Sequence, residues 1–465
     1  MNRLNFIRTG WLAFVTGVVL VLMVGCGGNA GTSHADYAAA VENPDFYHRS
    51  LKKLTDIIVH DIFSPPQASR IYAYPNIAAY EVLAQGNPDY RSMAGQLHDL
   101  PPIPAYDTAS QVNLPLAAIE AFTLVGKALI FSEEKMEAYR QELEEEYKAL
   151  GVPSSVRKAS KAYGLEVASH ILAWSNTDNY KETRTFPQYS VTDNENGRWT
   201  PTPPDYMAAI EPHWNKIRPF IIDSATQFVP PPPTAYDLQK NSGFMDEVRE
   251  VYEAVNNLDE ERTDIAQFWD CNPYVSHHQG HVMFATKKIT PGGHWMGITY
   301  IATQKAGVSF METSNAYARA SISLADAFIS CWDEKYRSNL IRPETIINEH
   351  IDESWRPLLQ TPPFPEYTSG HSVISSAAAI TLTEVFGDSF DFVDSTEVEY
   401  GLPPRSFDSF LDASSEAAIS RLYGGIHYMP AIVNGVEQGK KVGNYVVEHL
   451  ETRVSSPTTA AVETE

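Results

Sequence analysis

Three short motifs in the last third of the chain contain the residue types that hold and activate a tetrahedral oxyanion. They supply three basic side chains, a hydroxyl, a glycine and two histidines. Cationic donors bind oxyanions through charge-assisted hydrogen bonds, and histidine exchanges protons near neutral pH. The motifs therefore predict acid–base or ligation chemistry on a bound oxyanion. They are Lys335-x6-Arg342-Pro343, Ser369-Gly370-His371 and Ser420-Arg421-x5-His427.

The first motif predicts a cationic helix face. Lys335 and Arg342 are two helical turns apart and would point from one face, with Pro343 ending the helix directly afterwards. The plainer interpretation is a solvated basic face, to which Arg337 also belongs.

The other two motifs each allow two interpretations. Ser369-Gly370-His371 precedes a helical run, so free N–H groups at a helix start could face an anion. The alternative is an ordinary Ser-capped helix with a surface histidine. Gly424 and Gly425 are unfavourable inside a helix. They predict either a close approach of backbone to a ligand, or a helix that ends and restarts.

The elements that must position these motifs are predicted to be helices. Alternating polar and apolar runs are scarce, which favours an all-α architecture, and the resemblance described below implies two packed helical bundles. The proline run at 230–233 is the expected boundary between the bundles. The predicted helical segments are Ser132 to Leu150, Ser154 to Trp174, Met245 to Trp269 (one or two helices), Ser314 to Ile341, Ser372 to Phe386 and Ser414 to His449.

The first 25 residues resemble a bacterial export signal. Arg3 and Arg8 precede the apolar run from Trp11 to Val24, which is short for a bilayer span. The junction Met-Val-Gly-Cys26 resembles a lipobox, which predicts lipidation of Cys26 and anchoring in the cell envelope. A plain secretory signal is the alternative.

The predicted organisation therefore has five parts. They are a lipoprotein-type signal peptide (1–25), a flexible tether (26–45), an N-terminal helical bundle (46–229), a C-terminal bundle carrying the oxyanion site (230–451) and a disordered tail (452–465).

The charge balance limits the partners. The chain of 465 residues has 35 Lys and Arg against 58 Asp and Glu, a formal charge of −23. Such a surface repels nucleic acid and anionic lipid, so nucleic-acid binding is not expected and membrane contact is expected only through the lipid anchor.

The order and spacing of the three motifs resemble the signature of the superfamily that contains type 2 phosphatidic acid phosphatases and vanadium-dependent haloperoxidases. The segments GRWTPTPPDY, PGGHW and PPFPEYTSGHS also resemble the haloperoxidase branch, bacterial iodoperoxidases in particular. This resemblance implies two four-helix bundles with a vanadate cofactor in the second.

The resemblance also implies residue roles. His427 would be the axial vanadium ligand, and Lys335, Arg342 and Arg421 would neutralise the equatorial oxygens. The hydroxyl of Ser369 and the N–H of Gly370 would add hydrogen bonds, and His371 would act as acid–base catalyst. In a phosphatase, His427 would instead attack phosphorus and His371 would protonate the leaving oxygen.

Pocket residues favour the haloperoxidase. Trp332 and Phe364 match aromatic residues on the halide side of such pockets, and Asp333 and Tyr274 are expected at its border. The expected activity is oxidation of iodide or bromide by hydrogen peroxide, with small organic acceptors. An acid phosphatase with a phosphohistidine intermediate, and a non-catalytic lipoprotein, are the alternatives.

Two positions depart from the superfamily pattern. Thr368 replaces a proline before Ser-Gly-His, and Ala431 replaces an aspartate that orients the histidine four residues before it. His427 therefore needs another partner, for which a backbone carbonyl is one option.

A second group of residues has metal-ligand chemistry. His277 and His281 have the i, i+4 spacing of a zinc pair on a helix, with Cys271 and His278 nearby. No HExxH glutamate accompanies them, so polar residues near the pocket are the preferred interpretation. His294 is expected to be a structural loop residue. Cys271 and Cys331 could form a disulfide or remain free thiols.

Overall fold

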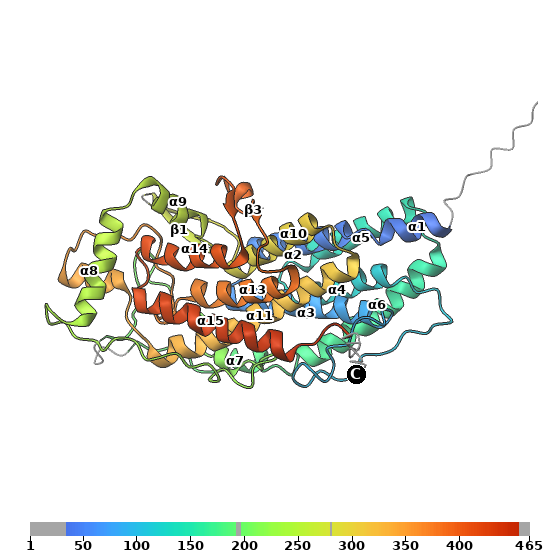
Figure 1. Ribbon diagram of the computed structural model, residues 1–465, viewed down its shortest axis with the longest axis horizontal. Coiled ribbons are helices and arrows are strands. Elements are labelled where there is room, and N and C mark those ends of the chain that lie inside the picture. The colour runs from blue at the N-terminus through green and yellow to red at the C-terminus, as the bar shows by residue number, and fades with distance from the viewer. Residues whose placement is uncertain (1–33, 192–196, 280, 455–465) are drawn as a thin grey trace, which may run out of the picture.

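The structure, a computed structural model, describes residues 34–191, 197–279 and 281–454 and is mainly helical (Figure 1). The predicted signal peptide and Cys26 lie outside these residues. Within them, no helix combines the length and hydropathy that a membrane span requires. The helices are α1 (His34–Val41), α2 (Asp45–Asp61), α3 (Pro65–Ala84), α4 (Leu114–Leu129), α5 (Glu133–Ala149), α6 (Ser154–Ser175), α7 (Tyr180–Thr183), α8 (Gly243–Asn256), α9 (Glu260–Phe268), α10 (Pro291–Ala306), α11 (Phe310–Ser338), α12 (Pro343–His350), α13 (Gly370–Phe386), α14 (Phe410–Tyr423) and α15 (Met429–His449), with short 3-10 turns η1 (Trp214–Lys216) and η2 (Val398–Tyr400).

The prediction of a mostly helical fold is confirmed. Two small antiparallel hairpins are the β-structure of the described chain: β1 (Val275–Gln279) with β2 (Val282–Thr286), and β3 (Phe392–Asp394) with β4 (Arg405–Phe407). In the first, His277 pairs with Phe284. The alternative of a helical i, i+4 pair formed by His277 and His281 therefore does not apply.

The central helix is α11, which joins two groups of helices. It packs on α3, which itself packs on α4 and α6, and also on α13, which packs on α14 and α15. Its N-terminus has a reciprocal capping box between Ser309 and Glu312. Small side chains along it allow close approach, and nearly every residue from Phe310 to Lys335 is buried. A helix buried all round can present a charged side chain only to an internal site.

One hydrophobic core runs through both groups of helices, from Tyr37 to Leu450. The division at residue 230 stays a prediction. Parts of the predicted tether and tail have a different structure from that expected. Residues 34–41 of the tether form α1, and Thr452 of the tail accepts a hydrogen bond from Arg91 N at 2.9 Å.

The segment between α7 and α8, irregular apart from η1, packs against α11. Asp326 of α11 accepts hydrogen bonds from the N–H groups of Phe220, Ile221 and Ile222 at 2.7, 2.7 and 3.0 Å. Nearer the C-terminus of α11, Trp332 Nε1 donates to Ile210 O at 3.3 Å. These contacts place Ile210 over the cavity described next.

Candidate active site

Lys335 lies near the C-terminus of α11 and is fully buried. Its Nζ donates to the carbonyl oxygens of Pro365, Glu366 and Thr368 at 3.1, 3.1 and 2.5 Å. Burial lowers the pKa of Lys335 to about 7, because no anion compensates its charge fully. The carbonyls direct the ammonium group towards the loop that leads into α13.

Arg342 reaches the same place from a different element than the sequence predicted. Helix α11 ends at Ser338, and Arg342 is the N-cap residue of α12, with Pro343 at its first position. Pro343 therefore starts a helix, which its fixed φ favours, and the expectation that it ends one is wrong. Arg342 Nε donates to Phe364 O at 2.9 Å and Nη1 to Ile426 O at 2.7 Å.

The Ser-Gly-His motif forms the start of α13, as predicted. Ser369 is the N-cap, Gly370 is the first helical residue, and the first-turn N–H groups lack intrahelical partners. His371 lines the cavity, and the interpretation as a surface histidine does not apply. Burial, followed by the charge of Arg421, lowers the pKa of His371 well below its usual range.

Arg421 lies in the last turn of α14, and its Nη2 donates to Trp269 O at 2.7 Å. The helix ends at Tyr423, and α15 starts at Met429. Gly425, with φ of +76°, lies in the connection, so the glycine pair ends one helix before the next begins. His427 follows in this connection and is 3% exposed.

The partner of His427 is a carboxylate that the sequence analysis missed. Its Nδ1 lies 2.8 Å from Glu366 Oε1, which also accepts the Tyr428 N–H at 2.9 Å. Because Oε1 already accepts one N–H, it acts as acceptor for Nδ1–H as well, even though burial raises the pKa of Glu366 to about 8. The Nε2 lone pair of His427 then faces Arg342 Nη1, 3.2 Å away. Glu366 thus takes the place left by Ala431.

Two buried nitrogens in this group have no hydrogen-bond partner within the described parts of the chain. They are Arg342 Nη2 and His371 Nε2. The unpartnered donor Arg342 Nη2 costs stabilising free energy, and an oxyanion would supply its acceptor, while a hydroxyl of that anion could donate to His371 Nε2. The residues present therefore fit vanadate or phosphate. We call Lys335, Arg342, Ser369, Gly370, His371, Arg421 and His427 the oxyanion site.

The oxyanion site opens into a cavity of about 270 Å³ with a largely apolar wall. Trp332 and Phe364 line it, with ring centroids 5.0 Å apart, and Tyr274 lines it too. Asp333 is directed elsewhere: its carboxylate accepts from Asn215 Nδ2 at 2.9 Å and from Arg337 Nε at 3.2 Å.

The residues considered as an alternative metal-binding group do not come together. His277 Nε2 lies 2.9 Å from Thr286 Oγ1 in the β1–β2 hairpin, and His281 is exposed in its turn. Cys271 and Cys331 are buried free thiols. Cys271 instead contacts His294, which is fully buried and belongs to α10.

Comparisons with known proteins agree with this geometry. The model of the second helical-bundle domain of vanadium chloroperoxidases (VCPO) matches residues 315–456. A bacterial vanadium-dependent iodoperoxidase of known structure is 56% identical, with a TM-score of 0.85, over 89% of this chain and 98% of that chain. No curated protein sequence matches.

Two further structures share the fold at lower identity. The holo-type bacterial vanadium-dependent chloroperoxidase is 18% identical, with a TM-score of 0.65, over 84% of this chain and 93% of that chain. Its apo-type counterpart is 17% identical, with a TM-score of 0.62, over 84% and 96%. With 56% identity along nearly the whole of the iodoperoxidase, the chain belongs to the vanadium-dependent haloperoxidase family.

Proposed function

We propose that this enzyme oxidises iodide, and bromide as a second halide, with hydrogen peroxide. The observation that carries the proposal is the convergence of Arg421, His371 and His427 on one cavity with an aromatic wall, beside the buried side chains of Lys335 and Arg342. The 56% identity to an iodoperoxidase supports iodide as the preferred halide.

Vanadate is the proposed occupant of the oxyanion site. Lys335, Arg342 and Arg421 would neutralise its oxygens, with the Ser369 hydroxyl and the Gly370 N–H as further donors. His427 Nε2 would be the nitrogen ligand, because Glu366 holds the proton on Nδ1. When bound, the metal would supply Lewis acidity towards peroxide without changing its own oxidation state.

His371 is suited to move the proton of the peroxide. Its depressed pKa keeps the ring neutral near pH 7, so the Nε2 lone pair can accept a proton. Negative charge placed in the site would raise this pKa towards the neutral range, and the same nitrogen could then return the proton.

The aromatic wall is suited to the halide. Trp332 and Phe364 give the cavity an apolar wall beside the cations, which would favour a large, weakly hydrated anion. A phosphomonoester gains little from such a wall. The cations near Phe364 are Lys335, whose Nζ lies 5.0 Å from the ring centroid, and Arg342, whose Cζ lies at 5.1 Å.

A direct assay tests the proposal. The purified protein is reconstituted with vanadate and assayed for oxidation of iodide, bromide and chloride by peroxide, beside hydrolysis of a chromogenic phosphomonoester. We expect vanadate-dependent oxidation of iodide above bromide. Phosphate release without halide oxidation would contradict the proposal and favour the phosphatase chemistry.

Export and lipid anchoring in the cell envelope are proposed from residues 1–26. Detergent partitioning and mass spectrometry of the N-terminal peptide test them. A diacylglyceryl adduct on Cys26 and loss of membrane association in Cys26→Ala are expected. An unmodified N-terminal peptide from the mature protein would contradict the anchor.

A further inference from the structure

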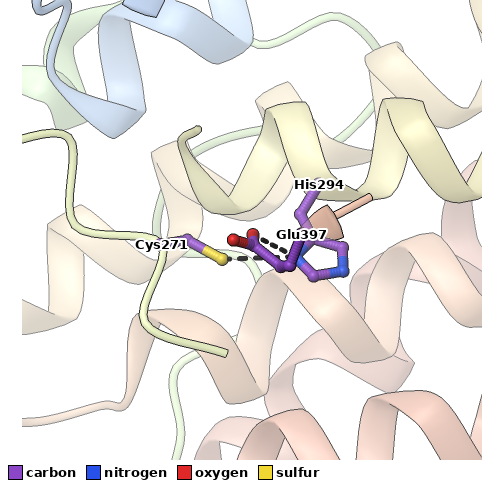
Figure 2. A group of neighbouring side chains, drawn as sticks. All are labelled: Cys271, His294 and Glu397. Carbon is purple, nitrogen blue, oxygen red and sulfur yellow. Dashed lines mark hydrogen bonds and ion pairs between the residues drawn. The ribbon is translucent and has the colours of Figure 1, made fainter. Parts of the chain in front are cut away.

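We propose that Cys271, His294 and Glu397 form a site for one Zn²⁺ ion next to the oxyanion site, whose cavity Cys271 also lines. The three side chains point towards one another from three segments: the connection after α9, the first turn of α10 and the residue before η2 (Figure 2). They are 2%, 0% and 0% exposed. We call them the thiolate cluster.

Two donor–donor distances in the thiolate cluster match those of a tetrahedral zinc site. His294 Nδ1 lies 3.4 Å from Cys271 Sγ and 3.2 Å from Glu397 Oε1. All three donor atoms lie within 4.8 Å of one another. With Zn–S of about 2.3 Å and Zn–N and Zn–O of about 2.0 Å, tetrahedral geometry separates sulfur from nitrogen by about 3.5 Å and nitrogen from oxygen by about 3.3 Å.

An independent observation, the environment of Glu397, indicates a cation-binding site. Both carboxylate oxygens of Glu397 are buried and accept no hydrogen bond from any described residue. Their one short charged contact is with His294 Nδ1, which also faces the thiol of Cys271. A buried carboxylate without donors is unfavourable, and a divalent cation between the three groups would remove that cost.

The far side of the His294 ring has the support that metal-bound histidines usually have. Nε2 lies 2.8 Å from Asp394 Oδ2 and 2.7 Å from Thr396 Oγ1, and the Thr396 hydroxyl donates to Asp394 Oδ1 at 2.7 Å. Asp394 therefore holds the proton on Nε2, and the Nδ1 lone pair is directed at Cys271 and Glu397. Thiolate, imidazole and carboxylate together favour zinc among the common divalent ions.

The bound ion would influence the oxyanion site through the backbone carbonyl of Trp269. Trp269 stacks on His294 with ring centroids 4.5 Å apart, and its carbonyl oxygen accepts from Arg421 Nη2 at 2.7 Å. Cys271 follows Trp269 by two residues, so a metal bond to its sulfur would also hold the Trp269 carbonyl in place. The zinc would thus help to orient Arg421.

Metal analysis of the full-length protein, purified without a polyhistidine tag or chelator, tests the proposal without any variant. After dialysis against Zn²⁺ and removal of free metal, we expect about one zinc per chain by elemental mass spectrometry, which counts vanadium separately. Less than about a tenth of a zinc per chain would overturn the proposal and leave His294 as an imidazolium ion-paired with Asp394 and Glu397.

Cobalt substitution identifies the ligands. A Co²⁺-loaded protein should show a thiolate-to-cobalt charge-transfer band in the near ultraviolet. Cys271→Ser should abolish the band, and Glu397→Gln should weaken Zn²⁺ binding by more than about 100-fold. Cys331→Ser, at the other buried free thiol, is the matched control and should keep the band. An unchanged band in Cys271→Ser would refute the site.

Discussion

Two buried histidines in this protein, His427 and His294, are each bonded to a carboxylate, but without a bound ligand their surroundings drive them to opposite charge states. Burial and then the charges of Arg342 and Lys335 lower the pKa of His427 well below its usual range. Burial also opposes the charge on His294, but Asp394 raises its pKa well above the usual range when no metal is bound. Burial alone therefore does not decide the charge state.

The difference lies in the rest of each site. Around His427 the basic side chains outnumber the one acidic partner, so the site attracts an anion. Around His294 two carboxylates and a thiol surround one ring, so the cluster attracts a cation. The same residue type thus serves opposite ligands, and each site can be perturbed without removing the other.

Replacing each of the two histidines by glutamine should give the largest difference in vanadate affinity between two variants. His427→Gln should weaken vanadate binding by more than about 100-fold, because it removes the proposed ligand. His294→Gln should leave vanadate binding within about 10-fold, because its effect reaches Arg421 only through Trp269. Vanadate titration followed by ⁵¹V NMR measures both, with circular dichroism as the control for folding. Equal losses in the two variants would contradict the separation.

The carboxylates behind the histidines form a matched pair with smaller effects. Glu366→Gln should weaken vanadate binding about 10- to 100-fold, because an amide can donate to Nδ1 and turn the ring proton towards the ligand. Asp394→Asn should lower zinc affinity by a similar factor and leave vanadate binding nearly unchanged. Affinities for both ions in both variants form the test, and a Glu366→Gln protein with normal vanadate affinity would refute the role of Glu366.

Glu366 also marks the limit of what motif spacing in the sequence could predict about the site. The seven residues of the oxyanion site lie in motifs whose spacing is readable, and the helices around them follow from periodicity and capping. The orienting carboxylate comes from the loop before α13, not from the position that Ala431 occupies, so motif spacing could not locate it. A lone glutamate in the apolar segment PPFPEY was the available signal.

Other features depended on long-range contacts. Lys335 and Arg342 were expected on one helix, but Asn339, with φ of +50°, ends α11 between them. Cys271 was grouped with His277 and His281 because they are close in sequence. Its actual neighbours, His294 and Glu397, are 23 and 126 residues away along the chain and meet it only through tertiary packing.

Vanadate affinity should fall as pH rises through the range in which Lys335 titrates. In the anion-free site its pKa is about 7, and a bound anion raises it, so binding takes up a proton above pH 7. The proton linkage should cost up to about tenfold in affinity per pH unit until the pKa of the bound state is reached.

Lys335→Arg isolates this effect, because arginine stays protonated throughout. The difference between the wild-type and variant profiles of vanadate affinity against pH cancels the contribution from the ionisation of vanadate itself. It also removes most of the contribution of Glu366, whose pKa of about 8 lies nearby. Parallel profiles would show that Lys335 is already charged in the free site.

The smallest expected effect concerns the aromatic ring beside each site. Phe364 lies at the cavity over Lys335 and Arg342, whereas Phe407 packs against Trp269 beside the thiolate cluster, with ring centroids 6.1 Å apart. Phe364→Leu keeps most of the apolar volume and removes the ring, so the KM for iodide should rise about two- to fivefold with kcat within about twofold.

Phe407→Leu is the control and should leave the KM for iodide unchanged. Because leucine excludes water almost as well as phenylalanine, a shift in KM would assign the ring a contact with halide. An unchanged KM in Phe364→Leu would place the halide away from this wall.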